Sequence, residues 1–293
     1  MADVLADLVA LLALEKLEEN LFRGQSQDLG WGTVFGGQVL GQALSAAVQT
    51  VPAERQPHSL HASFLKAGDV SRPIIYEVDR IRDGSSFTSR RVVAVQNGHA
   101  ILHLSASFQV DEPGFSHQDA MPAGVPAPES IPNEAERFAA AISKAPKALR
   151  RWSEIARPFD NRPIDESDDM VSPPKKPPRR MVWLKTIGAL PDQPALHRYL
   201  LAYASDAWFL TTALLPHGVT WLSPGMQVAS LDHAMWFHAP FRADEWLLHV
   251  IDSPVASGAR GLVRGSVFKR DGTLVASTAQ EGLIRRRPQR QGT

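Results

Sequence analysis

The 293-residue chain contains no cysteine. Disulfide bonds, thiolate nucleophiles and cysteine-ligated zinc or iron–sulfur sites are therefore excluded. It also lacks an excess of charge of either sign, because 31 Lys and Arg residues balance 31 Asp and Glu residues. Proteins that bind phosphate backbones are usually basic, so this balance argues against a nucleic-acid partner.

The sequence has no long hydrophobic run, and nothing in it approaches the ~18–20 apolar residues of a membrane span. The apolar stretch 8–14 is short, flanked by charges, and lacks the basic start and cleavage site of a secretory signal. Leu5, Leu8, Leu12 and Leu14 instead predict an amphipathic helix. The C-terminus carries no peroxisomal tripeptide. We expect a cytoplasmic protein without stable membrane insertion.

Proline is unevenly distributed, since residues 111–178 hold twelve of the 22 prolines. Proline removes a backbone donor and fixes φ, so this region has room for one helix, over 132–149, and for no other long regular element. The distribution predicts three segments. These are an N-terminal unit (1–110), a proline-rich linker region (111–178) and a C-terminal unit (179–293).

The two flanking units share one order of elements. In the first we expect a helix and four strands over 34–51, 58–67, 74–82, 86–96 and 99–110. In the second we expect the same elements over 194–215, 227–239, 245–253, 259–269 and 273–285. The last two strands of each unit form a hairpin, through Asn97-Gly98 and Asp271-Gly272, both strong hairpin signals. The repeat predicts a duplicated α+β unit with an antiparallel sheet around each helix.

Several blocks in this order are distinctive: FGGQVLGQAL, HSLHASFLKAGD, YASDAWFL, SLDHAMWFHAPF and STAQEG. With them the chain resembles the acyl-CoA thioesterase II family over residues 10–285. The resemblance implies an α+β double hotdog fold, in which two antiparallel sheets each wrap around a central helix. It also implies hydrolysis of fatty acyl-CoA to free fatty acid and CoA in fatty-acid metabolism, with no cofactor or metal because water is the only co-reactant.

The resemblance also implies the catalytic residues, because the family orients a water molecule with an Asp, a Thr and a Gln. The Asp maps to Asp206, inside the predicted helix, and the Gln maps to Gln280 in STAQEG. The Thr position is occupied by Ser230, which keeps the hydroxyl but loses the methyl group that restricts its rotamer. A carboxylate, a hydroxyl and an amide suit the positioning of a nucleophilic water.

Substrate contacts are expected at five further residues. Gly36 and Gly37 open the first helix, where free backbone N–H groups could stabilise an oxyanion, although helix–sheet packing explains them as well. Arg260 and Arg264 are candidates for the CoA phosphates, with solvated sheet-face charges as the alternative. Trp236 is a candidate for the wall of an acyl tunnel, with core packing as the alternative. The full set of candidate wall residues is Trp208, Phe209, Met235 and Trp236.

Two other functions fit parts of the pattern. A non-catalytic acyl-CoA binding or sensing protein would keep the tunnel and lose the three water-holding residues, which are present here. An enoyl-thioester hydratase would need an acidic residue paired with a histidine in the helix region, and the first histidine after Asp206 is His217, beyond the helix.

The histidines give no metal signal. His233 and His238 are five residues apart, which places them on opposite faces of one strand, so we expect structural histidines.

Exposed sheet edges are covered by pairing in stable proteins, and hotdog proteins generally associate, so we expect a homodimer or a dimer of dimers.

Overall fold

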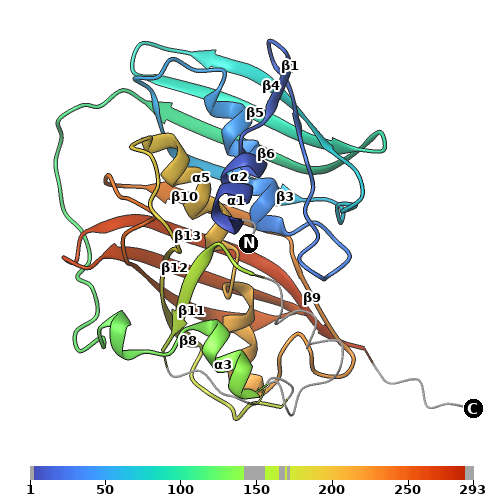
Figure 1. Ribbon diagram of the computed structural model, residues 1–293, viewed down its shortest axis with the longest axis vertical. Helices are drawn as coiled ribbons and strands as arrows, with labels where there is room; N and C mark the ends of the chain where they lie inside the picture. Colours follow the sequence, from blue (N-terminus) through green and yellow to red (C-terminus); the bar gives the residue numbers. More distant parts are fainter. Residues whose placement is uncertain (1–2, 142–155, 165–168, 170–171, 288–293) are drawn as a thin grey trace, which may run out of the picture.

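The protein is described by a computed structural model that covers residues 3–141, 156–164, 169 and 172–287. Its centre is one antiparallel sheet, with the strands in the order β1-β2-β4-β5-β6-β3-β10-β13-β12-β11-β8-β7 and β9 paired with β13 beside β10. The two halves of the chain form the two ends of this sheet, and the helices gather along it (Figure 1). Within the described residues, none of the helices combines the length and the apolar character that crossing a membrane would require.

The strands follow the predicted pattern with additions at both edges. Those of the N-terminal half are β1 (Glu15–Glu18), β2 (Leu21–Gly24), β3 (Gln56–Phe64), β4 (Ile74–Asp83), β5 (Phe87–Gln96) and β6 (His99–Gln109). Those of the C-terminal half are β7 (Phe159–Pro163), β8 (Arg179–Thr186), β9 (Met226–Ser230), β10 (Asp232–Phe237), β11 (Leu247–Ser257), β12 (Arg260–Lys269) and β13 (Leu274–Arg286). Both predicted hairpins are confirmed, and β1, β2, β7 and β8 were not predicted.

The two expected antiparallel sheets are joined into one. Strand β3 of the first half pairs antiparallel with β10 of the second, with Leu60 opposite Met235 and Ala62 opposite His233. Each half therefore pairs with the backbone hydrogen-bonding groups at the edge of the other half, and the two predicted sheets form one continuous sheet. An unpaired strand edge attracts other chains, so this internal pairing removes two such edges.

The helices are α1 (Val4–Leu12), α2 (Gly36–Val48), α3 (Glu134–Ala141) and α5 (Pro194–Ser205), with the 3-10 helices η1 (Pro128–Ser130) and η3 (Leu210–His217). The predicted N-terminal helix is confirmed for Leu5, Leu8 and Leu12, which are buried in α1, whereas Leu14 lies beyond the end of the helix. Its first turn is capped by Asp3, whose carboxylate accepts from the backbone N–H of Leu5 and Ala6 at 3.2 Å.

Helices α2 and α5 lie side by side at the centre of the molecule (Figure 1). Three small residues of α2, Ala43, Ala46 and Ala47, are completely buried. Gly37 meets α5 most tightly, because a methyl group there would overlap the carbonyl oxygen of Tyr203. This contact brings the start of α2 against the end of α5, and the candidate site lies at that junction.

The proline-rich region holds more structure than a linker. It contributes β7, which pairs with β8 at the far edge of the sheet, from Phe159 opposite Thr186 to Pro163 opposite Val182. An edge strand tolerates Pro163 because one side of such a strand has no partner. The helix expected over 132–149 begins at Glu134, and the part of it beyond 141 lies outside the described residues. The division into 1–110, 111–178 and 179–293 stays a prediction.

We predict that Gly37→Ala destabilises the fold by about 1–3 kcal/mol, because the added methyl group forces α2 and α5 apart. Urea unfolding followed by far-UV circular dichroism would measure the change. Gly114→Ala is the matched control, since a Cβ at Gly114 meets nothing within 4 Å. Equal unfolding midpoints for the two variants would show that the helix contact is not tight.

Candidate active site

Asp206 lies at the end of a helix, and the expectation of one continuous helix over 194–215 is wrong. α5 ends at Ser205, Asp206 is its C-cap, and η3 begins only at Leu210. Between them Trp208 adopts a left-handed backbone conformation with φ of 63°. Such a conformation is strained for a bulky residue and ends a helix. Asp206 therefore projects from a break in the helix.

Three hydrogen bonds to the carbonyl oxygen of Trp208 stabilise this break in the helix. Arg180 donates from Nη1 at 2.9 Å, Thr211 from Oγ1 at 2.9 Å and Thr212 from Oγ1 at 3.2 Å. The guanidinium of Arg180 also lies 5.2 Å from the centroid of the Trp208 ring, within cation–π range. Arg180 is 7% exposed, so these interactions are made largely away from water.

The three predicted catalytic side chains meet at this break. Gln280 donates from Nε2 to Asp206 Oδ1 at 3.2 Å and to Ser230 Oγ at 2.5 Å. Ser230 donates in turn to Asp206 Oδ1 at 3.4 Å. Gln280 is buried and comes from β13, while Asp206 and Ser230 are half-buried and line the adjoining cavity. One carboxylate oxygen of Asp206 is thus occupied by protein donors.

An irregularity in the sheet sets the position of Ser230. The strand predicted over 227–239 is interrupted at Leu231, and β9 and β10 pair with β13 in registers that differ by one residue: Ser230 is opposite Gly282, and Ala234 is opposite Ala279. Leu231 is the extra residue of a bulge. In a regular strand Ser230 and His233 would face opposite sides of the sheet, and the bulge turns both toward Gln280.

The first glycine of α2 lies against the carboxylate of Asp206. A Cβ on Gly36 would be 2.6 Å from Asp206 Oδ2, so α2 can approach this oxygen closely only because residue 36 has no side chain. The N-cap residue Phe35 offers no side-chain hydrogen bond to the first turn of α2. The amino end of α2, with its partial positive charge, therefore faces the carboxylate at the carboxyl end of α5. Gly37 is explained by the contact with Tyr203 instead.

Behind these residues the structure adds two that the sequence did not indicate. His233 Nδ1 lies 3.2 Å from Gln280 Oε1, and its Nε2 lies 3.0 Å from Ser205 Oγ. His233 and Ser205 are completely buried. Burial lowers the pKa of His233, although Asp206 and the hydrogen bond with Gln280 raise it. Strict strand alternation would have put His233 on the other face from Ser230, which is why the pattern gave no signal.

A second buried histidine lies close by on β11. His249 Nε2 is 3.2 Å from Thr278 Oγ1, and its ring centroid is 5.3 Å from that of Phe209. The ring of His233 lies 5.6 Å from the same phenylalanine. Burial, followed by the charge of a protonated His233, lowers the pKa of His249 to about 3. Both histidines are therefore neutral near pH 7.

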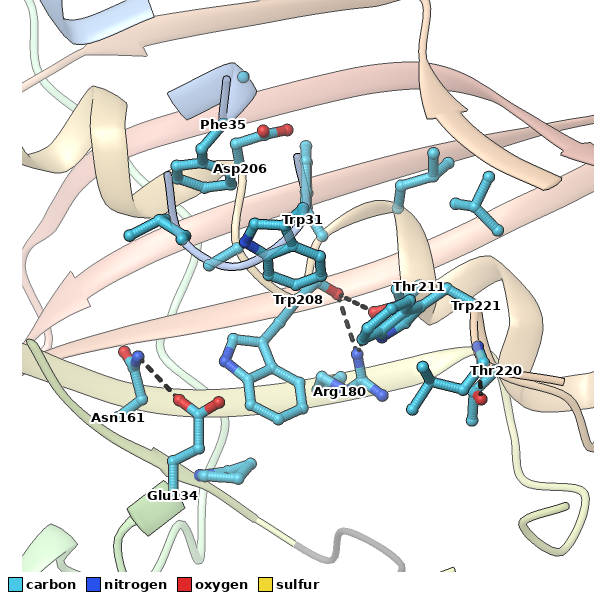
Figure 2. Close-up of a pocket in the computed structure, with 18 of the residues that line it drawn as sticks. Trp31, Phe35, Glu134, Asn161, Arg180, Asp206, Trp208, Thr211, Thr220 and Trp221 are labelled. Atoms are coloured by element: carbon cyan, nitrogen blue, oxygen red, sulfur yellow. Dashed lines mark hydrogen bonds between the residues drawn. The ribbon is translucent and has the colours of Figure 1, made fainter. Parts of the chain in front are cut away.

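A cavity of about 480 Å³ opens from Asp206 and Ser230. Figure 2 shows Asp206 and Phe35 at one end and Glu134 and Asn161 at the other. Trp31, Trp208 and Trp221 lie between these ends, with the ring centroids of Trp31 and Trp221 4.9 Å apart. Two of the four candidate wall residues, Trp208 and Phe209, line this cavity. It offers an apolar surface directly beside a carboxylate.

The other substrate-binding candidates are not brought to this cavity. Arg260 Nε donates to Glu281 at 2.9 Å, and Arg264 makes two hydrogen bonds to Asp252 at 3.1 and 2.7 Å, both on the exposed face of the sheet. Trp236 lies on that face as well, against His61, with ring centroids 5.2 Å apart. Arg180 is a basic residue that does line the cavity. Among the described residues no cluster of histidine and acidic side chains could hold a metal ion.

Known acyl-CoA thioesterases are similar to this chain along nearly its whole length. Residues 168–283 match a family model described as acyl-CoA thioesterase, and residues 26–109 match one described as acyl-CoA thioesterase N-terminal domain. The chain is 45% identical over 285 residues to acyl-CoA thioesterase 2 of Haemophilus influenzae, across 97% of this chain and 99% of that protein.

Solved structures are similar as well. An acyl-CoA thioesterase II, TesB2, from Mycobacterium marinum aligns with a TM-score of 0.78 and 42% identity over 96% of this chain and 98% of that one. A protein from Alicyclobacillus acidocaldarius described as having a hot dog fold aligns with a TM-score of 0.76 over 96% of this chain and 99% of that one. At 21% sequence identity, this similarity shows the fold alone.

The low pKa of His249 predicts how stability depends on pH. An unfolded chain binds a proton at this residue below about 6.5, but the folded protein does so only near pH 3. The stability that the neutral ring provides is therefore complete above pH 6.5 and lost as the pH falls toward 3. As the pH is lowered, the free energy of unfolding of His249→Gln should decrease less steeply than that of the wild type. The two slopes should differ by up to about 1.4 kcal/mol per pH unit. Urea unfolding of both proteins between pH 7 and 4 would measure this, and parallel curves would contradict it.

Proposed function

The chain belongs to the acyl-CoA thioesterase family, and from that premise we propose that it hydrolyses fatty acyl-CoA with a water molecule oriented by Asp206, Ser230 and Gln280. The observation that carries the proposal is the meeting of these three side chains beside an apolar cavity. Each comes from a different element, α5, β9 and β13, so their contact is a product of the fold.

The carboxylate of Asp206 suits the role of base. Its Oδ1 accepts hydrogen bonds from Gln280 and Ser230, and Asp206 lines the cavity together with Gly36. A water molecule in that cavity would donate a hydrogen bond to Oδ2. During attack, the water oxygen bonds to the thioester carbonyl carbon and Asp206 takes the proton. The C–S bond then breaks, and the CoA sulfur leaves with that proton.

The developing oxyanion needs donors, and the amino end of α2 supplies candidates. The first backbone N–H groups of a helix have no partner within it, and the helix dipole adds partial positive charge there. We assign the N–H groups at Gly36 and Gly37 to this role. In a partly water-excluded site such preorganised donors stabilise a transition state more than they do in water.

The apolar wall of the cavity suits the acyl chain. Trp208 and Phe209 lie two and three residues after Asp206 and line the same cavity, so a chain along them would begin at the scissile carbonyl. Arg260 and Arg264 remain our candidates for the CoA phosphates only if their ion pairs with Glu281 and Asp252 open on binding. Trp236 is proposed as a contact on the same outer face.

We also propose the organisation of the fold into units, the oligomeric state, the location and the metabolic role. We assign the two halves of the sheet to two hotdog units in one chain, centred on α2 and α5, on the strength of the similar hot dog structure. We propose a homodimer or a dimer of dimers, a cytoplasmic location and a role in fatty-acid metabolism, in keeping with a full-length bacterial relative.

Replacing Asp206 tests the catalytic assignment directly. We predict that Asp206→Asn lowers kcat by about 10²–10⁴-fold, because the amide cannot take the proton from water. Thiol release from acyl-CoAs of graded chain length measures this, and the protein contributes no thiol of its own. Unchanged acyl-CoA binding, followed by calorimetry, is the control. A wild type that binds but never releases thiol would favour the sensing function.

The residue at position 230 should matter for its hydroxyl group alone. We predict that Ser230→Ala lowers kcat by roughly 3- to 10-fold, equivalent to one hydrogen bond of about 0.5–1.5 kcal/mol. Ser230→Thr, which restores the residue expected from the family pattern, should keep full activity. Steady-state kinetics on one acyl-CoA compares the two variants. Equal losses would mean that size, and not the hydroxyl, is what the site requires.

A further inference from the structure

We infer that His233 is a positioning residue for the hydrolysis, because its imidazole holds the Gln280 amide in the orientation that serves Asp206 and Ser230. The inference rests on the proposed function, since it concerns the same three side chains. It assigns a role to a buried histidine that would otherwise be taken as part of the core.

The direction of each hydrogen bond follows from the carboxylate. An ionised carboxylate only accepts hydrogen bonds, so the Gln280 atom 3.2 Å from Asp206 must be the amide nitrogen. The amide oxygen then faces His233, and Nδ1, at 3.2 Å, must carry a proton to donate to it. Nε2 of the neutral ring is left as an acceptor for the Ser205 hydroxyl at 3.0 Å, and the same hydroxyl also lies 3.0 Å from the backbone carbonyl oxygen of Ala202, so the two acceptors share its one proton. This series, Ser205–His233–Gln280–Asp206, is the hydrogen-bond relay.

Burial makes the relay difficult to replace. Gln280 is 1% exposed and His233 and Ser205 are not exposed at all, so water cannot substitute for a lost donor. Without His233 the amide oxygen of Gln280 would be buried and unpaired, which is unfavourable. The amide could then rotate, and its oxygen would face the carboxylate and repel it. The N–H groups that hold Asp206 and Ser230 would be lost together.

His249 distinguishes a positioning role from ordinary burial. It is 2% exposed, lies against the same Phe209 ring and is also a histidine of the inner sheet face. Its hydrogen bond goes to Thr278, and in the described part of the chain no hydrogen bond joins the Thr278 side chain to Asp206, Ser230 or Gln280. Loss of either histidine should therefore cost stability, whereas only the loss of His233 should disturb the catalytic residues.

The test compares His233→Leu with His233→Asn, His233→Gln and His249→Leu. Asn keeps an N–H near the position of Nδ1, whereas Gln carries its amide toward Ser205. We expect His233→Leu and His233→Gln to lower kcat about 10- to 100-fold with little change in KM, because the catalytic groups are displaced by a fraction of an ångström. His233→Asn should recover most of the rate. His249→Leu should lower the melting temperature and leave kcat within twofold.

Repeating His233→Asn and His233→Gln in a Gln280→Ala background completes the test. If His233 acts only through Gln280, the two double variants should have equal kcat, within about twofold of Gln280→Ala alone. Equal kcat for His233→Asn and His233→Gln with Gln280 intact would overturn the inference, as would full additivity in the double variants. Should Gln280→Ala itself keep wild-type kcat, the proposed function fails instead, so the two failures are distinguishable.

Discussion

The hydrogen bond from the Gln280 amide to Asp206 is the interaction on which the site depends. A carboxylate at the carboxyl end of a helix lies at the unfavourable end of the helix dipole and needs donors. Gln280 and Ser230 supply them on one oxygen, and the amino end of α2 faces the other. The carboxylate is thereby held in a fixed direction without being fully buried.

This arrangement requires two departures from regular structure. The left-handed backbone at Trp208 ends α5 and lets Asp206 project toward the sheet, and Arg180 stabilises that turn. The bulge at Leu231 turns Ser230 and His233 to the same face. Both irregularities interrupt regular secondary structure, and both lie within a few residues of Asp206 or Ser230. Strain and bulges concentrate in this way where a side chain must be aimed.

Most of the fold could be predicted from local patterns, and the departures could not. The hairpins at Asn97-Gly98 and Asp271-Gly272 follow from turn chemistry, and the burial of the N-terminal leucines of α1 follows from helix periodicity. The joining of β3 to β10 is a long-range pairing that no local signal encodes. Asp206, Ser230 and Gln280 could be named only through family resemblance. His233 escaped notice because a single extra residue inverts the alternation on which the strand prediction relied.

The direction of the hydrogen bonds in the relay determines the tautomer of His233, which can be measured. Nitrogen-15 NMR of protein labelled at histidine, with His233→Asn used for assignment, would measure the state of both ring nitrogens. We predict a neutral ring near pH 7 that is protonated at Nδ1 and unprotonated at Nε2. A ring protonated at Nε2 and unprotonated at Nδ1 would contradict the proposed relay, because His233 could then not donate to Gln280.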